Sequence, residues 1–395
     1  MNNVKAIIKG MTLYKRSDGR YEGRITVNGK RKSFYGTTKV EVKNKAKEYL
    51  TKVENGYIEP TKVVFNEYIE YWLKTYKKNK IQDSSYSRLY TTYLHQIKPT
   101  IGQMKMGNIK TKDIQNLIDE YANPTSADVK PLSLSGLKKL THLIRPCMQM
   151  AVTEGLLQKN PCDNVVFPQE DCIQVDTKQQ YSLSDDELKT LRMAVLTKYK
   201  NGRYRSRDWI VLLIMLNTGL RVGEMLALTW KDIDFENRTM HICKTLQSNI
   251  RNYDDLEHVV YYSKIKKSAK TKNGVRYISL NTQVLQYLQM LRGFDEENKI
   301  KSDYVACTTV GTMNCSRNLQ RSLDRLVKFA GIQPESHVSL HTLRHTFGST
   351  LLRHGIGIEV ISKLMGHANI TITYNKYIHV IQEEQAKAMN LVNVC

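Results

Sequence analysis

Alternating apolar and polar residues near the start of the chain predict a β-hairpin followed by a helix. Residues 21–27 alternate in the manner of a half-buried strand, and residues 30–35 have the composition of a returning strand. The Asn-Gly pair at 28–29 favours a tight turn, because both residues tolerate a left-handed backbone. A helix over about 37–53 should follow, so residues 1–58 are expected to form a small β-sheet with one helix.

The next stretch changes to helical periodicity. An amphipathic segment covers 65–73, a second helix is expected over 84–98, a third begins near 111, and a long fourth covers 132–157. Prolines then end the pattern. We therefore expect residues 64–168 to form a helical domain.

A polar segment, 169–180, is predicted to be an exposed linker. Beyond it, residues 209–217 form a nearly continuous apolar run of helical length, while 240–243 and 275–280 have the pattern of short strands. Residues 181–395 are expected to form one more domain, mostly helical. The whole chain is then a multi-domain protein, mainly α with small β-sheets.

The charge of the chain indicates a polyanionic partner. The 395 residues include 60 Lys and Arg against 38 Asp and Glu, a formal net charge of +22. DNA or RNA is the commonest such partner, and a membrane surface is the weaker alternative because no basic amphipathic helix stands out. Charge alone does not separate an enzyme from a protein that only binds nucleic acid.

Other features of composition favour a cytoplasmic protein without disulfides. No apolar run reaches the roughly 18 residues of a membrane span, and the N-terminus lacks the apolar core of a signal peptide. The 7 cysteines are scattered and include no CxxC pair, which disfavours a disulfide framework and a zinc site. We expect free thiols in a reducing compartment and no bound metal.

The N-terminal block is strongly basic. Up to Pro60 it has ten Lys and four Arg against six acidic residues. A sheet edge rich in such residues can enter a DNA groove, and a solvated basic face is an equally good interpretation. The candidate DNA contacts are Arg20, Arg24, Lys30, Arg31 and Lys32.

Two segments of the third block offer cations for phosphate chemistry. Arg221 starts a short predicted helix, where a guanidinium can bind a phosphate, and Glu224 is positioned to hold it. The alternative is an exposed Arg–Glu pair of little energetic value. Lys270 lies beside a predicted turn and can protonate a leaving oxygen, although composition alone favours a solvated hairpin. Four further lysines lie nearby: Lys264, Lys266, Lys267 and Lys272.

Two later segments offer a base and a nucleophile. His341 and Arg344 share a helix face, being three residues apart, whereas His345 is expected to point elsewhere and to be structural. His367 follows a glycine that should end a helix, and Tyr377 comes ten residues later. A phenol can attack phosphorus, but tyrosines near a C-terminus are more often packing residues.

In order and local context, these residues resemble the catalytic set of the tyrosine recombinases, or phage integrases. The matching segments are TGLRVGEMLAL, KTKNGVRYISL, HTLRHTFGSTLL and LMGHANITITYNKYIHV. The matching positions are Arg221, Lys270, His341, Arg344, His367 and Tyr377. The resemblance extends over nearly the whole chain, and integrases of Gram-positive conjugative transposons are the subgroup that it resembles most.

The resemblance implies three parts: a mainly helical tyrosine-recombinase catalytic domain, a helical core-binding domain, and an N-terminal arm-binding module. It implies that Tyr377 attacks the scissile phosphate to form a 3′-phosphotyrosyl link while a 5′-hydroxyl leaves. Lys270 would protonate that leaving oxygen, and His341 would assist Tyr377 as a base. The two arginines would neutralise the transition state, and His367 would hydrogen-bond a non-bridging oxygen. No cofactor would be needed.

The family also implies double-stranded DNA with core and arm sites as the substrate, four protomers and a Holliday junction. An excisionase and a host DNA-bending protein are further candidate partners. The amphipathic tail after Tyr377 would dock on a neighbouring protomer, and packing within the same protomer is the alternative. Two features depart from compact members: residues 245–267 look longer, and Tyr374 is a second phenol. The family pattern Tyr-x-His selects Tyr377, because His379 follows it.

Two other functions are weighed against recombination. A type IB topoisomerase shares the chemistry, but the separate basic N-terminal module favours a recombinase. A non-catalytic DNA-binding protein would have no need of all six matching positions. A metal-dependent nuclease is a third alternative, and EDTA would stop its cleavage.

Overall fold

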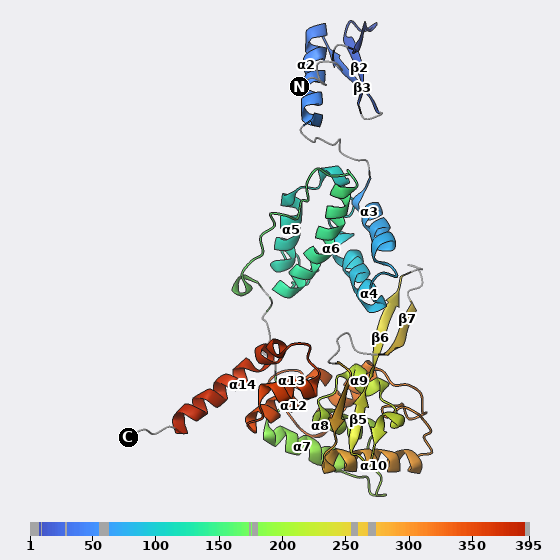
Figure 1. Ribbon diagram of the computed structural model, residues 1–395, viewed down its shortest axis with the longest axis vertical. Coiled ribbons are helices and arrows are strands. Elements are labelled where there is room, and N and C mark those ends of the chain that lie inside the picture. The colour runs from blue at the N-terminus through green and yellow to red at the C-terminus, as the bar shows by residue number, and fades with distance from the viewer. Residues whose placement is uncertain are drawn as a thin grey trace. The chain divides into compact units, whose positions relative to one another are not determined.

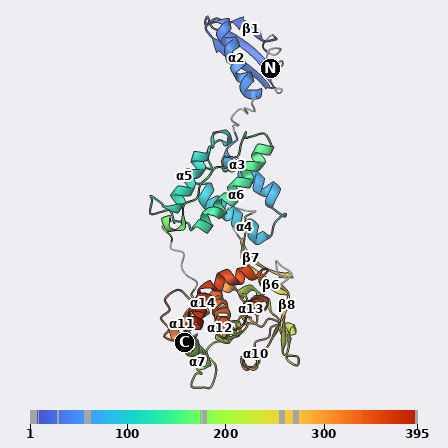
Figure 2. The same cartoon turned by 60° about the vertical axis from the view of Figure 1, so that its left-hand side comes forward.

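A computed structural model of the protein describes residues 8, 10–27, 30–54, 63–173, 175, 181–253, 260–267 and 274–391. They belong to two compact units, one up to residue 177 and the other from residue 178. Figure 1 and Figure 2 show the elements of both units from two sides. The predicted turn at 28–29, part of the predicted linker, and Lys270 lie outside the described residues.

The first unit begins with a three-stranded antiparallel sheet and a helix on one of its faces. The elements are β1 (Thr12–Lys15), β2 (Tyr21–Val27), β3 (Lys30–Gly36) and α2 (Lys39–Glu54). Ile25 of the sheet packs with Val42 and Leu50 of the helix in a small core. The hairpin pairing of β2 with β3 and the helix agree with the sequence pattern, while β1 was not predicted.

The rest of the first unit is helical. Its helices are α3 (Phe65–Trp72), α4 (Asp83–Thr92), α5 (Thr111–Ala122) and α6 (Leu134–Thr153), with the short turns η1 (Leu73–Lys77), η2 (Tyr93–Ile97), η3 (Met106–Asn108) and η4 (Glu170–Cys172). Several tyrosines that alternate with lysines in the sequence pack inside: Tyr90 and Tyr93 are buried, whereas Tyr71 is exposed. Tyr90 and Tyr93 therefore belong to the core, and Tyr71 does not.

The second unit combines eight described helices with two small antiparallel sheets. The helices are α7 (Asp185–Leu196), α8 (Arg207–Thr218), α9 (Val222–Ala227), α10 (Thr282–Glu297), α11 (Ser316–Phe329), α12 (Leu340–Arg353), α13 (Ile358–Met365) and α14 (Ile370–Leu391). One sheet has the order β4 (Ile233–Asp234), β5 (Thr239–Ile242), β8 (Arg276–Ser279), and the other pairs β6 (Lys244–Asn252) with β7 (Val260–Lys267). The short turn η5 (Trp230–Asp232) precedes β4.

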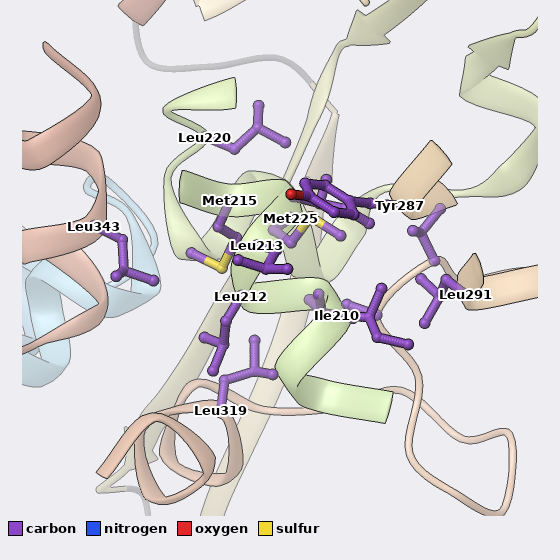
Figure 3. Close-up of a cluster of buried hydrophobic side chains, with 14 of the residues drawn as sticks. Ile210, Leu212, Leu213, Met215, Leu220, Met225, Tyr287, Leu291, Leu319 and Leu343 are labelled. Atoms are coloured by element: carbon purple, nitrogen blue, oxygen red, sulfur yellow. The ribbon is translucent and has the colours of Figure 1, made fainter. Parts of the chain in front are cut away.

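Helix α8 forms the centre of the core of this unit. Residues 209–215 are all buried, and α8 packs against α7, α10, α11 and α12. Figure 3 shows Ile210 of α8 among residues of its neighbours, such as Leu291 and Leu319. A helix covered on several sides needs apolar residues all round, which explains the unbroken apolar run in the sequence. In the described part of the chain, no helix is both long and apolar enough to cross a bilayer.

A buried ion pair connects the start of α8 to the end of α10. Arg207 donates to Asp295 from Nε at 2.6 Å and from Nη2 at 2.8 Å. Its remaining hydrogen bonds go to the carbonyls of Val305 and Cys307. The Arg207 side chain is 1% exposed, so its charge depends on these partners.

We expect Asp295→Ala to lower the free energy of unfolding by about 3–5 kcal/mol, because it leaves the Arg207 guanidinium buried without its carboxylate. Urea unfolding followed by tryptophan fluorescence measures the change. Asp186→Ala is the matched control, because Asp186 pairs with Lys189 on the surface, and it should change the value by less than about 0.5 kcal/mol. Equal losses in the two variants would contradict a structural role for the buried pair.

Candidate active site

Two glycine turns present predicted site residues directly after buried helices. Helix α8 ends at Gly219, with φ of 63°, and Arg221 is the N-cap of α9. Helix α13 ends at Gly366, with φ of 62°, and His367 follows. Glycine adopts this left-handed conformation without the steric cost that a Cβ brings. Both turns therefore end a helix abruptly and leave its last carbonyl groups available.

Glu224 holds two arginines. Its carboxylate accepts hydrogen bonds from Arg221 Nη1 at 2.8 Å and from the Arg221 backbone N–H at 3.0 Å. Arg276, on β8, donates to both carboxylate oxygens at 3.1 and 2.9 Å. Burial by itself raises the pKa of Glu224, but the hydrogen bonds and charges of Arg276 and Arg221 hold it below its ordinary value. The Arg–Glu pair predicted from spacing is therefore part of a largely buried network.

The last carbonyl groups around the end of α13 each accept a hydrogen bond from a different arginine. Arg276 Nε donates to Leu364 O at 2.8 Å, Arg344 Nη2 to Met365 O at 2.5 Å, and Arg221 Nη2 to Gly366 O at 3.0 Å. The negative end of a helix favours cations at this position. These bonds fix three guanidinium groups around one helix terminus.

Arg344 also contacts the end of α8. It is 1% exposed, and its Nη1 donates to the carbonyl of Gly219 at 2.7 Å. Burial, followed by the charge of Arg221, lowers the pKa of Arg344, but a guanidinium remains protonated at neutral pH. Arg344 therefore connects the two glycine turns through one buried positive charge.

His341 is exposed on α12 and has two notable neighbours. Lys376 Nζ, on α14, lies 3.3 Å from His341 Nε2. The ring of His345 packs edge-on against His341 with 4.4 Å between centroids, and it also lies 6.0 Å from the ring of Tyr377. His345 is buried against both rings, because residues four apart on a helix are neighbours. It does not line the cavity that His341 and Arg344 line, which agrees with the expectation that it points elsewhere and is structural.

His367 is buried after the turn of α13. Its Nδ1 lies 2.7 Å from Thr373 Oγ1. Burial, followed by the charges of Arg344 and Arg221, lowers the pKa of His367 to about 3. Its imidazole is therefore neutral at physiological pH in this structure.

The predicted residues meet at a cavity of about 420 Å³. Five of them line it: Arg221, Glu224, His341, Arg344 and His367. The other lining residues are Thr245, Gln247, Lys266, Gly366, Ala368, Ile372 and Lys376. The set contains two arginines and two lysines against one carboxylate, which suits an anion such as a phosphate group.

Tyr377 does not line this cavity. Its side chain is 1% exposed and belongs to a small apolar cluster with Ile361 and Met365. The hydroxyl donates to Met365 Sδ at 3.4 Å, and a Cβ at Gly348 would collide with it. Burial raises the pKa of Tyr377 to about 12. The structure therefore shows the candidate nucleophile enclosed, while Tyr374 is exposed.

Three basic residues of the site received no role from the sequence. Arg276 shares Glu224 with Arg221, and Lys266 and Lys376 line the cavity. Lys266 lies opposite Thr245 in the pairing of β6 with β7, so both reach the same cavity. Lys266 was among the lysines that the sequence left as alternatives to Lys270. Lys376 directly precedes Tyr377 in the sequence, and this position could have indicated that it belongs to the site.

Arg24 and Arg31 lie on the sheet face opposite α2, as strand alternation requires, since Ile25 faces the core. Arg24 donates to Glu22 Oε1 at 2.8 Å and lies over the Tyr14 ring. The hydrogen bond from Arg24 is the main reason that the pKa of Glu22 falls to about 2. This face therefore carries arginine and tyrosine side chains around a carboxylate.

The other predicted N-terminal contacts are placed differently. Lys32 lies over the ring of Tyr49, on α2, so it is on the helix side of the sheet. Arg20 donates to Asp18 at 2.8 Å within the turn after β1. The side chain of Lys30 lies outside the described residues. Only part of the predicted basic set thus shares one face.

One group in the described part of the chain can ligate a metal ion. The ligand atoms of Asp232, His241 and Cys243 lie within 4.8 Å of one another. Lys244 Nζ lies 2.8 Å from Asp232 Oδ2, so a metal ion would compete with that ammonium group. The sequence gave no sign of this group, because Asp232 comes from a separate turn before the strand.

The sequence is similar to those of a known recombinase and a known transposase. A XerC-like tyrosine recombinase of Caldanaerobacter subterraneus is 29% identical over 398 residues, which is 95% of this chain and 97% of the relative. The transposase of transposon Tn916 from Enterococcus faecalis is 26% identical over 258 residues, 63% of this chain and 60% of the relative.

Solved structures show the same fold. The integrase of transposon Tn1549, in complex with a circular intermediate DNA, has 21% identity and a TM-score of 0.62, covering 82% of this chain and 99% of that one. A lambda integrase tetramer bound to a Holliday junction has 16% identity and a TM-score of 0.57, covering 92% and 94%. These similarities confirm the predicted fold class.

The model of the phage integrase family matches residues 181–384, and that of the phage integrase N-terminal SAM-like domain matches residues 64–121. With its mainly helical fold and its arginine- and histidine-lined cavity, the protein is a site-specific recombinase. The chain belongs to the phage integrase family, the tyrosine recombinases, as the sequence motifs indicated.

We expect the free energy of unfolding to fall as pH is lowered from about 6.5 towards 4, partly through His345. Burial lowers the pKa of His345 to about 3, whereas an unfolded histidine titrates near 6.5. Between these values the unfolded state binds more protons, so stability rises with pH. His345→Phe should reduce the slope by up to about 1.4 kcal/mol per pH unit. Urea unfolding over this window tests it, and identical slopes would contradict the assignment.

Proposed function

We propose that this recombinase integrates and excises a mobile element through a covalent 3′-phosphotyrosine at Tyr377. The observation that carries the proposal is the convergence of two arginines and two histidines, from segments far apart in sequence, on one cavity. A phosphodiester resists attack largely because its negative charge repels nucleophiles. Fixed guanidinium groups neutralise that charge without reorganisation during the reaction.

In the proposed reaction, the scissile phosphate occupies the cavity beside Arg221 and Arg344, and His367 donates a hydrogen bond to a non-bridging oxygen. The phenol oxygen of Tyr377 bonds to phosphorus as the bond to the 5′ oxygen breaks. His341 accepts the phenol proton, and a lysine, by family resemblance Lys270, protonates the leaving oxygen. The 5′-hydroxyl of a partner duplex reverses these steps. The phosphotyrosine conserves the bond energy, so no nucleotide is consumed.

Tyr377 must leave its apolar cluster for this chemistry. Helix α14 contains both Tyr377 and Lys376, and its N-terminal part packs on α12 and α13 (Figure 1). A rotation or local unwinding of this helix would expose the phenol. We infer that contacts of the α14 tail with a neighbouring protomer bias that movement, which would couple cleavage to assembly.

The proposed substrate is double-stranded DNA, and the proposed working form is a homotetramer on it. The net charge of +22 supports a polyanionic substrate. The Tn1549 integrase was solved with DNA, and lambda integrase was solved as a tetramer on a Holliday junction. We assign residues 1–58 to arm-type DNA, residues 64–168 to core DNA and residues 181–395 to catalysis, joined through 169–180. An excisionase and a host DNA-bending protein are proposed partners, in the cytoplasm.

We expect Tyr377→Phe to abolish a covalent protein–DNA adduct that the wild type and Tyr374→Phe both form. The phenol oxygen of Tyr377 is the proposed nucleophile, and phenylalanine keeps the ring but lacks that oxygen. The substrate is a duplex of the element's end with a bridging phosphorothiolate at the scissile position, and the adduct is detected by denaturing electrophoresis in EDTA. Loss of the adduct only in Tyr374→Phe would show that Tyr374, and not Tyr377, is the nucleophile. A bound duplex without any adduct in the wild type would overturn the catalytic function.

A second experiment identifies the general acid among Lys270, Lys266 and Lys272. With an ordinary 5′-oxygen leaving group, Lys270→Ala should slow single-turnover cleavage by on the order of 10²–10⁴-fold. The bridging phosphorothiolate should restore most of the rate, because a thiolate needs no proton to leave. Lys266→Ala should slow both substrates by similar factors. Selective rescue of Lys266→Ala or Lys272→Ala instead would reassign the acid.

A further inference from the structure

Helix α14 contributes Ile372 and Lys376 to the lining of the cavity, and Tyr377 is not among the lining residues. Lys376 lines the cavity, and its Nζ lies 3.3 Å from His341 Nε2. Tyr377, the next residue, is enclosed in the apolar cluster on another side of the same helix. Successive residues of an α-helix are about 100° apart. While α14 remains helical, Lys376 and Tyr377 therefore cannot both enter the cavity.

The cavity has more positive charge than its own acid neutralises. Its lining includes Arg221, Arg344, Lys266 and Lys376, while Glu224 is the carboxylate among the lining residues. That carboxylate already accepts hydrogen bonds from two guanidinium groups, one of them outside the lining set. Like charges so close repel one another in a partly buried site. An anion placed among these groups would remove the repulsion.

Lys376 is a poor structural residue at this position. Burial, followed by the charges of Arg344 and Arg221, lowers its pKa. Its ammonium group donates to the imidazole of His341. That imidazole is itself neutral, because partial desolvation, followed by the charge of Lys376, lowers the pKa of His341 to about 4. A neutral partner does not compensate the charge of this partly buried ammonium group. A phosphate oxygen would compensate this charge. By bonding to Lys376 Nζ, it would also release His341 Nε2 from the ammonium group.

We propose, on the basis of the function proposed above, that Lys376 binds the scissile phosphate in the complex that forms before Tyr377 enters the cavity, and that it withdraws when Tyr377 attacks. Lys376 thereby holds the substrate in the enclosed-tyrosine state. When Lys376 withdraws, His341 Nε2 becomes available to accept the proton of the Tyr377 phenol. One movement of α14 thereby removes Lys376 from the phosphate and brings Tyr377 to it.

The proposal predicts that loss of Lys376 weakens DNA binding without slowing cleavage at saturating DNA. An interaction present in the bound state and absent from the transition state strengthens binding without accelerating the reaction. Lys376→Ala should therefore weaken DNA binding roughly three- to tenfold and lower the slope of log affinity against log salt by about 0.9, the value for one phosphate contact. The cleavage rate at saturating DNA should rise, by up to the factor by which binding weakens, because the bound state loses a stabilisation that the transition state does not have.

The test uses the full chain and the duplex described for Tyr377. Affinity is measured by fluorescence anisotropy across a KCl series in the Tyr377→Phe background, where no cleavage competes. Single-turnover adduct formation at saturating DNA is measured with Tyr377 present. Lys376→Arg should restore affinity, because it keeps the charge, and Lys328→Ala, at an exposed lysine of α11, should change neither quantity.

Unchanged affinity and salt slope in Lys376→Ala would overturn the proposal, even if cleavage became faster, because Lys376 would then only obstruct the cavity. A fall of the saturated rate by two orders of magnitude or more would also overturn it, since Lys376 would then act in the transition state. In both cases the wild type still forms an adduct. Absence of that adduct on a bound duplex is the separate result that refutes the proposed function itself.

Discussion

The arrangement of the site depends on how several positive charges are held together at short range. Two like charges 4 Å apart repel by about 4 kcal/mol at the effective dielectric near a protein surface. Glu224 offsets part of this repulsion by accepting hydrogen bonds from Arg221 and Arg276. The backbone carbonyl groups of residues 364–366 offset a further part of the repulsion, because each accepts a hydrogen bond from a different arginine. One buried carboxylate and one helix terminus thus hold the guanidinium groups in place for the proposed phosphate ligand.

The need for carbonyl groups that can bond these arginines accounts for the abrupt ends of α8 and α13. The carbonyl groups at the end of α13 are available because Gly366 turns the chain into the left-handed region. Gly219 does the same for α8 and supplies the other carbonyl that Arg344 bonds. The apolar core around α8 fixes the first terminus, and α12 brings Arg344 across to the second. The charged site is therefore positioned by packing, and local sequence supplies only the turns.

The sequence predicts those parts of the fold and site that depend on local patterns. The apolar run of α8, the N-terminal hairpin and the turns before Arg221 and His367 follow from periodicity and glycine. It does not predict the pairing of β6 with β7, because Leu246 and Ile250 are the apolar residues of β6 and the register of the pairing shifts between Gln247 and Ile250. The second arginine on Glu224 was missed for a similar reason, since tertiary packing brings β8 to α9 and no spacing encodes that approach.

The largest difference between sequence and structure concerns Tyr377, and it has a physical cause. A phenol is apolar enough to fill a cavity in a core and polar enough to attack phosphorus, so its position cannot be inferred from residue type. In this structure the apolar cluster holds it, and burial raises its pKa, which suppresses the phenolate. Lys376 cannot be buried in that cluster at similar cost, because its charge would lose solvation. The two neighbours are therefore separated by polarity in this structure, with Tyr377 in the apolar cluster and Lys376 at the cavity. Only a ligand that bonds strongly to the cavity, or a contact that reorients α14, can offset the preference.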